Sequence, residues 1–181
     1  MAQNATIHKI DLTISDMDSH YYETHKLTVA KHPSETDERL MVRLVAFALH
    51  AREHLEMTRG LSSEDEPDIW QKSLSGELQL WISLGQPSEK IIRQSCSKSE
   101  QVVIYSYGGR PTEAWWNKIK GQVARFDNLR VLSLPEPATK ALARHMERSL
   151  SMQITVQDGD VMVNIGEELL EITPDIWKGA A

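Results

Sequence analysis

The amino-acid sequence predicts a single mixed α/β domain over residues 1–181, and three observations lead to that prediction. Of the 181 residues, 40% are hydrophobic and 25% are charged, which is typical of a chain that buries a globular core. Strand-like alternation near both ends of the chain is interrupted by segments with helical spacing. Two short apolar segments, at residues 102–105 and 129–134, flank a helical segment, which predicts parallel strands in a mixed central sheet with flanking helices.

Both ends of the chain predict β-hairpins. Apolar and polar residues alternate over residues 10–14 and again over residues 21–30, with polar turn residues between them. Residues 153–157 and 161–165 flank Asp158-Gly159, a dipeptide that favours a two-residue hairpin turn. We expect these two hairpins to extend the edges of the central sheet.

A long helix is predicted from Ser34 to about Met57, with Gly60 as its end. Ser34 is the expected N-cap because Asp37 follows three residues later, which is an acidic variant of the capping box. Apolar residues recur after it at helical spacing, so one face of this helix should be buried.

The middle of the chain predicts strands and helices that follow one another closely. In order, they are strands over residues 68–74 and 78–84, a helix capped by Ser88, a strand over 102–105, a helix capped by Thr112, a strand over 129–134 and a helix over 135–148. Because a helix joins the strands at 102–105 and 129–134, we expect those strands to be parallel.

Charge and composition exclude several classes of protein. The net charge of −6 argues against a strongly basic nucleic-acid-binding surface, although it is compatible with a local basic cleft. The single Cys96 excludes an intramolecular disulfide. No apolar segment approaches the roughly 18 residues that span a bilayer, and no export signal precedes residue 10, so we expect a cytoplasmic protein with no membrane partner. The oligomeric state is left open.

His50 and His54 stand in an H-x-x-E-H pattern. In one group of zinc peptidases this pattern places two histidines on one face of a helix. Here the pattern lies at the polar end of the predicted helix, and no third ligand is identifiable. We therefore expect both side chains to be exposed to solvent and to retain no zinc.

Two groups of acidic residues are candidate ligands for Mg²⁺ or Mn²⁺. Glu35 and Glu38 are three residues apart in the predicted first turn of the long helix, so they should share a face. Asp65, Glu66 and Asp68 lie where a strand begins. Carboxylates that converge at a strand edge form a hard-oxygen site that can activate water. Helix capping and a solvated loop explain the same residues without a metal.

Four segments resemble the YaeQ family of small bacterial proteins. They are HPSETDERLM at residues 32–41, TRGL at residues 58–61, DEP at residues 65–67 and LWISLGQP at residues 80–87. The resemblance covers nearly the whole chain. The fold of that family resembles the PD-(D/E)XK nuclease core, which has a helix, three partly antiparallel strands, a helix and a parallel strand. The resemblance therefore implies a nuclease-like core to which the two hairpins are added.

The resemblance also implies roles for particular residues. It makes Glu35 or Glu38 the acidic residue of the first core helix, and Pro67-Asp68 the PD element. Asp68, with Asp65 or Glu66 and with Glu35 or Glu38, would hold the metal ion. Lys90 or Arg93, on the helix after Ser88, would polarise the phosphate.

The chain departs from the nuclease pattern at the strand that should carry (D/E)-x-K. It reads Ser83-Leu84-Gly85 there, and Gln79, on the same face, offers only a neutral amide oxygen. The loss of an acidic ligand weakens divalent-cation binding, so we predict a nuclease-like protein that binds nucleic acid or a protein partner without catalysis. The alternative is a Mg²⁺- or Mn²⁺-dependent phosphodiesterase that acts on nucleic acid.

Overall fold

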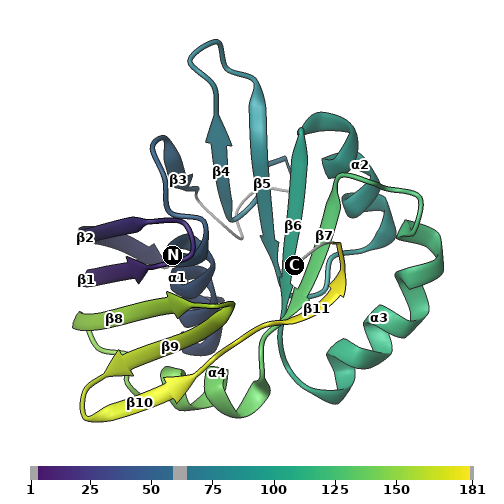
Figure 1. The fold of residues 1–181 in the computed structure, drawn as a ribbon. Helices are drawn as coiled ribbons and strands as arrows, with labels where there is room; N and C mark the ends of the chain where they lie inside the picture. The colour runs from purple at the N-terminus through teal and green to yellow at the C-terminus, as the bar shows by residue number, and fades with distance from the viewer. Residues whose placement is uncertain (1–3, 59–64, 180–181) are drawn as a thin grey trace. The chain divides into compact units, whose positions relative to one another are not determined.

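The computed structural model describes residues 4–58 and 65–179, and within these ranges it contains eleven strands and four helices. The chain divides into two compact units. The first is made of Met1–Arg52 and Pro137–Thr173, and the second of Glu53–Glu136 and Pro174–Ala181. Each unit contains one mixed β-sheet (Figure 1). The predicted mixed α/β class is therefore confirmed. The prediction of a single domain stays a prediction, which an unfolding experiment described below tests.

The first unit is a five-stranded sheet with one helix packed against it. Its strand order is β10-β9-β8-β1-β2, and α1 contacts β1 and β8. Neighbouring strands are antiparallel except for β1 and β8, which are parallel. The elements are β1 (Thr6–Asp16), β2 (Tyr21–Lys31), α1 (Asp37–Leu49), β8 (Ser149–Gln157), β9 (Asp160–Ile165) and β10 (Glu168–Glu171), together with α4 (Glu136–Ala143), which begins at the unit boundary.

Alternation along the strands determines which face of this sheet is buried. Ile10, Leu12 and Ile14 of β1 are almost completely buried, and so are Met152 and Ile154 of β8. Their neighbours along each strand are exposed or half-buried, as period-2 side-chain geometry requires. The helix α1 is buried without interruption over residues 40–48, so this sheet face and the helix share one core.

Asp18 connects the turns of the two hairpins in this unit. Its carboxylate oxygens accept hydrogen bonds from the backbone N–H groups of Asp158 and Gly159, both at 2.8 Å. Asp158 (φ 53°) and Gly159 (φ 82°) both have left-handed backbone conformations, which a two-residue type I′ turn requires and which Asp-Gly favours.

Both predicted hairpins are confirmed, but the prediction that they extend a single central sheet is wrong. The parallel pairing of β1 with β8, in which Leu12 lies opposite Met152, joins the hairpins into a sheet of their own. Alternation shows which face of a strand is buried, but it carries no information about which distant strand becomes its neighbour.

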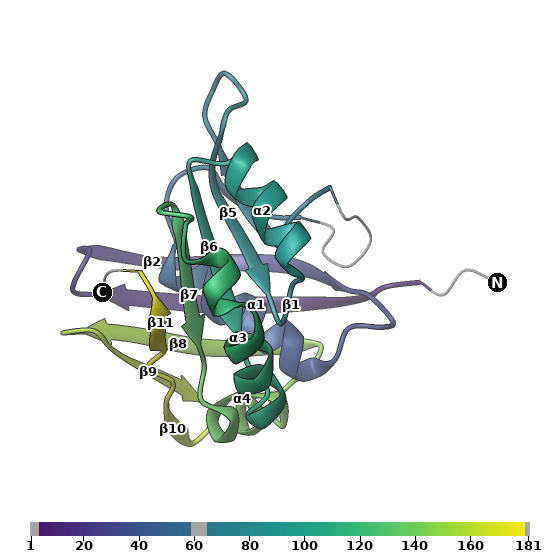
Figure 2. The same ribbon diagram turned by 90° about the vertical axis from the view of Figure 1, so that its right-hand side faces the viewer.

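The second unit is a six-stranded sheet in the order β11-β7-β6-β5-β4-β3. Strands β5, β6 and β7 are parallel, as predicted for β6 and β7, and the outer pairs are antiparallel. The elements are β3 (Leu55–Met57), β4 (Ile69–Lys72), β5 (Leu78–Leu84), α2 (Glu89–Lys98), β6 (Gln101–Ser106), α3 (Arg110–Val123), β7 (Leu129–Ser133) and β11 (Asp175–Lys178). Figure 2 shows α2 and α3 next to each other, and α2 also contacts β6.

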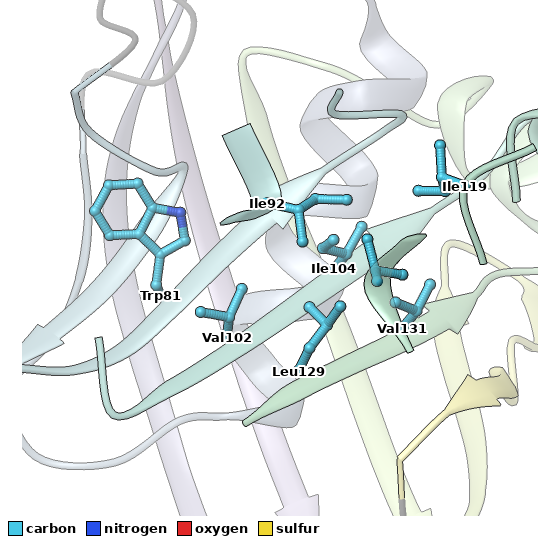
Figure 3. Packing of buried hydrophobic residues seen from close by; sticks show 8 residues of the cluster. Trp81, Ile92, Val102, Ile104, Ile119, Leu129 and Val131 are labelled. Atoms are coloured by element: carbon cyan, nitrogen blue, oxygen red, sulfur yellow. The ribbon is translucent and has the colours of Figure 1, made fainter. Parts of the chain in front are cut away.

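The core of the second unit lies between its sheet and the helices α2 and α3 (Figure 3). The strands contribute most of the buried side chains, while Ile92 comes from α2, and Ile119 and Val123 come from α3. The full set is Trp81, Ile92, Val102, Ile104, Ile119, Val123, Leu129 and Val131. On β6, five consecutive residues from Val102 to Ser106 are buried, which explains the uninterrupted apolar segment in the sequence.

The predicted boundaries of the first helix are wrong at both ends. Thr36, not Ser34, is the N-cap, and its hydroxyl accepts the N–H of Arg39 at 3.1 Å. The helix α1 ends at Leu49 rather than near Met57, because the chain turns through His54 (φ 67°) into the short strand β3. The predicted helix end at Gly60 lies outside the described residues.

Four further elements differ from the sequence prediction. Gly109 (φ 69°), not Thr112, is the N-cap of α3; Pro111 occupies the first turn, and Thr112 is buried. The last helix, α4 (Glu136–Ala143), is shorter than predicted, and the short strands β10 and β11 were not predicted. Across residues 4–58 and 65–179, no helix combines the length and the apolar character that crossing a membrane requires.

Burial of Tyr105 predicts a loss of stability in alkaline solution. Burial raises the pKa of this tyrosine, although the nearby charge of Arg130 acts in the opposite direction. Its phenol therefore stays protonated in the folded chain at a pH at which an unfolded tyrosine ionises, near pH 10. The buried phenol of Tyr105 makes its full contribution to the free energy of unfolding below that pH. Above it, we expect the free energy of unfolding of the wild type to fall by up to about 1.4 kcal/mol per pH unit relative to Tyr105→Phe. Urea unfolding of both proteins between neutral and alkaline pH measures the difference. The prediction would be contradicted if the free energy of unfolding fell equally with pH in the two proteins.

Candidate functional site

The structure brings Asp68 and Ser83 together at one end of the antiparallel pair β4–β5. Ile69 pairs with Ile82, and the N–H of Asp68 donates to the carbonyl of Ile82 at 3.1 Å, so Asp68 comes next to Ser83. Asp68 is only 6% exposed, and its Oδ2 accepts the backbone N–H of Leu84 at 3.0 Å. The carboxylate therefore stabilises the end of β5 directly.

Thr58 attaches the Pro67-Asp68 segment to the end of β3. Its N–H donates to the carbonyl of Asp68 at 3.0 Å, and its hydroxyl donates to the carbonyl of Pro67. Asp65 and Glu66, at the start of the same segment, are exposed and half-exposed respectively. Only Asp68 of this acidic group is thus buried among hydrogen-bond donors.

Ser83 provides a neutral hydroxyl at the position where the resemblance implies an acidic residue. Its Oγ accepts a hydrogen bond from the indole Nε1 of Trp81 at 3.2 Å. Gly85, where the nuclease pattern has a lysine, has a φ of 87°, a left-handed conformation that favours glycine over any side chain. Gln79 is half-buried and lies where the register between β4 and β5 shifts, so alternation along β5 does not place its amide on the face of Ser83.

The two predicted cationic residues lie on the solvent side of α2. Lys90 is exposed, and the guanidinium of Arg93 forms an exposed ion pair with Glu89 at 3.2 Å. Glu89 also lies 3.7 Å from Arg125. Ser88 is the N-cap of α2, as predicted, and it accepts the N–H of Ile91 at 3.3 Å. The cations are therefore on the predicted helix, with Arg93 already next to a carboxylate.

In the first unit, Glu35 is buried between two arginines that the sequence analysis did not select. Its Oε2 contacts Nη1 of Arg39 at 2.9 Å, and its Oε1 contacts Nη2 of Arg43 at 2.7 Å. Arg43 is 3% exposed and also donates to the carbonyl of Ala30 at 3.0 Å. The spacing was a signal in the sequence, because Arg39 and Arg43 are four residues apart on one face of α1, at four and eight residues from Glu35.

Glu38 has a different environment from Glu35. Glu35 precedes the N-cap Thr36, so the two acidic residues are not both in the first helical turn, as we had predicted. The Oε2 of Glu38 accepts the hydroxyl of Thr139 at 3.1 Å, which joins α1 to α4.

The two histidines of the H-x-x-E-H pattern do not share a helical face. His50 is the C-cap of α1, whereas His54 lies beyond the helix in a left-handed conformation. His54 is exposed, as predicted, and His50 is half-buried rather than largely exposed. The absence of bound zinc stays a prediction.

The donors around the predicted metal site do not fit Mg²⁺ or Mn²⁺ in the way that the resemblance implies. Among residues 4–58 and 65–179, no three side chains of His, Cys, Asp or Glu are grouped so that they could hold a metal ion. The residue next to Asp68 on β5 is the neutral Ser83, and both carboxylate oxygens of Glu35 contact guanidinium groups. Hard divalent cations bind best where several carboxylates converge.

Known proteins resemble the chain over nearly its full length. The family model described as "YaeQ protein" matches residues 1–174. The uncharacterized YaeQ proteins of Salmonella typhi and Escherichia coli (strain K12) are 37% and 34% identical over 178 residues, which is 98% of each chain. Among solved structures, YaeQ from Xanthomonas axonopodis pv. citri has a TM-score of 0.93 and 46% identity, and covers 97% of this chain and 99% of that one. YaeQ from Pseudomonas syringae has a TM-score of 0.93 and 32% identity over 97% of each chain.

Proposed function

This chain belongs to the YaeQ family, and we propose that it is a non-catalytic binding protein built on a nuclease-like core. The observation that carries the proposal is that the residue next to Asp68 on the neighbouring strand is the neutral Ser83. At the strand end where a nuclease would place a second carboxylate, Ser83 accepts a hydrogen bond from Trp81.

Element order and strand direction support the nuclease-like core. Along the chain, α1 is followed by β3, β4, β5, α2 and β6. The pairs β3–β4 and β4–β5 are antiparallel, and β5–β6 is parallel. This is the order of elements that the resemblance implies. Function still depends on the site rather than on the fold, because one fold hosts many activities.

The chemistry of the acidic residues supports a role without catalysis. Metal-assisted cleavage needs several carboxylates close together, whose mutual repulsion is offset by the divalent cation that they share. The carboxylate of Glu35 is instead neutralised by Arg39 and Arg43, and Asp68 accepts a backbone N–H. A divalent cation would have to displace these contacts before it could bind.

The charge of the chain favours a protein partner over nucleic acid. Affinity for nucleic acid depends largely on Lys and Arg that neutralise phosphates, and the chain has a net charge of −6. Lys90 and Arg93 share one face of α2, but Glu89 offsets the charge of Arg93, so this face carries little net positive charge. A cytoplasmic location remains a prediction from the sequence.

One observation favours the alternative, a Mg²⁺- or Mn²⁺-dependent phosphodiesterase that acts on nucleic acid. Asp68 and Ser83 lie together at a strand end, as the corresponding nuclease positions would. In that reading, Asp68 with Asp65 or Glu66 holds the cation, and Lys90 or Arg93 contacts the phosphate.

A cleavage assay separates the two functions. We expect the wild type, incubated with single- and double-stranded DNA and RNA in Mg²⁺ or Mn²⁺, to cleave no more than buffer does. We also expect Ser83→Glu to bind Mn²⁺ more tightly than the wild type in titration calorimetry, because it places a second carboxylate beside Asp68. Cleavage by the wild type that is lost in Asp68→Asn and kept in the surface control Glu113→Ala would overturn the proposal in favour of the phosphodiesterase.

A further inference from the structure

The strand β2 is an open edge of the five-stranded sheet. It is the last strand of that sheet, and among the described residues no other strand pairs with its outer side (Figure 1). Over its eleven residues it pairs with β1 without a register shift, and it contains no proline. Its first half is accessible: Tyr22 is 56% exposed, and Glu23, Thr24 and Lys26 are exposed. Long regular edges of this kind are templates for strand addition.

The direction of the backbone groups on β2 follows from the hydrogen bonds of its neighbour. The N–H groups of Lys9 and Met17 donate toward β8, to Arg148 at 2.7 Å and to Val156 at 2.9 Å. Odd-numbered residues of β1 therefore direct their backbone N–H and C=O groups toward β8, and even-numbered residues direct theirs toward β2. Because even-numbered residues of β1 pair with odd-numbered residues of β2, the even-numbered residues of β2 direct their N–H and C=O groups outward.

A second contact agrees with this direction. Ala30, an even-numbered residue of β2, has its carbonyl occupied by the guanidinium of Arg43 rather than by β1. In the accessible first half of the strand, the outward N–H and C=O groups belong to Tyr22, Thr24 and Lys26.

We propose that two copies of this chain associate by pairing their β2 strands antiparallel, about a two-fold axis at Thr24. In this register Thr24 lies opposite itself, and Tyr22 lies opposite Lys26 of the other copy, where the ammonium can lie over the ring. On the other face of the sheet, Glu23 lies opposite His25 of the other copy. The outward groups of the three even-numbered residues then form about six backbone hydrogen bonds between the copies.

Neighbouring registers are less complementary. An axis at His25 places His25 opposite itself and Glu23 opposite the apolar Leu27. An axis at Lys26 places two ammonium groups directly opposite each other, which is destabilising. Of these three registers, the one with the axis at Thr24 is therefore the most complementary, as an isologous interface between identical chains requires. The paired segment is short, so the dimer is weak, and the fraction of chains in dimers rises with protein concentration. This inference does not rest on the proposed function.

Two proline variants test the pairing. Thr24→Pro removes the N–H at the axis from both copies, and we expect it to weaken association by about tenfold or more, because two hydrogen bonds are lost. Thr28→Pro is the matched control: its N–H also points outward, but in the proposed register it lies opposite the turn residue His20, outside the paired segment. Proline is tolerated on an edge strand whose N–H faces outward, so both variants should fold. Sedimentation velocity across a range of concentrations measures association.

Two further measurements make the result specific to this edge. Tyr22→Lys should abolish association because it places ammonium groups opposite Lys26, whereas Tyr22→Phe, which keeps the ring, should preserve it. In the wild type, the amides of Tyr22, Thr24 and Lys26 should exchange more slowly as concentration rises, while that of Thr28 should not change. A wild type that sediments as one chain at all concentrations would overturn the proposal. So would equal effects of the two proline variants, or a dimer that persists in Thr24→Pro.

Discussion

Replacement of Glu35 by alanine is expected to lower the free energy of unfolding by about 3–5 kcal/mol. The substitution removes a carboxylate that is 5% exposed and that contacts Arg39 at 2.9 Å and Arg43 at 2.7 Å. Arg43 is itself 3% exposed, so its positive charge would stay in the interior without this counter-charge. Burial of a charge after its counter-charge is removed is among the largest penalties that a single substitution can cause.

Variants at Arg43 separate the charge effect from lost packing. Arg43→Met removes the buried cation and leaves Glu35 in contact with Arg39, so it should cost less than Glu35→Ala. The double variant should be closer to the wild type than Glu35→Ala alone, because no arginine then stays at position 43. If the double variant loses as much as the sum of the two single changes, the ion cluster does not account for the effect.

The same variant tests whether the two compact units unfold together. All five tryptophans, at positions 70, 81, 115, 116 and 177, belong to the second unit, whereas Glu35 belongs to the first. If the chain is one cooperative domain, Glu35→Ala should shift the tryptophan fluorescence transition in urea as far as it shifts the far-ultraviolet circular dichroism transition. An unmoved fluorescence transition would show that the units unfold separately, and would contradict the single-domain prediction.

Asp68→Ala is expected to lower the free energy of unfolding by about 1.5–3 kcal/mol, the range for a hydrogen bond to a charged group. Asp68 is buried, and its Oδ2 accepts the N–H of Leu84 at 3.0 Å, so the substitution leaves that amide without its carboxylate acceptor. Because Asp68 belongs to the same unit as every tryptophan, fluorescence-monitored urea unfolding reports the change directly.

Glu66→Ala is the matched control for Asp68→Ala. Glu66 is two residues earlier in the same segment and is half-exposed, so its removal should change the free energy of unfolding by no more than about 0.5 kcal/mol. Equal losses in the two variants would indicate that the negative charge of the segment matters rather than the buried hydrogen bond. A stability of Asp68→Ala equal to that of the wild type would contradict the structural role of this carboxylate.

Local patterns in the sequence predicted the elements of the second unit most accurately. The strand predicted over residues 78–84 has the observed bounds of β5, and Ser88 caps α2 as expected. The parallel pairing of β6 with β7 followed from the helix between two fully buried strands. Each of these features depends on residues close together in the chain, whose spacing and capping chemistry can be read directly.

The end of α1 shows where local patterns are ambiguous. Leu55 and Met57 continue the apolar spacing of the helix, yet they also alternate as a strand does. Pairing with β4, in which Leu55 lies opposite Gln71 and Met57 opposite Ile69, makes the segment a strand. Intrinsic propensity over three residues is too weak to outweigh a ladder of hydrogen bonds to a distant segment.

The candidate site divides in the same way between sequence and structure. The family resemblance in the sequence made Asp68 the carboxylate of the Pro-Asp pair and Ser83 the neutral residue where the nuclease pattern has an acid, and alternation predicted which faces of the strands are buried. Only the tertiary structure showed that Asp68 bonds Leu84, that Glu35 lies between Arg39 and Arg43, and that the two hairpins share a sheet with an open edge at β2. A side chain's pattern position determines its preferred secondary structure and burial, but its partner depends on which distant segments come together, and that is decided by packing and strand pairing over the whole chain.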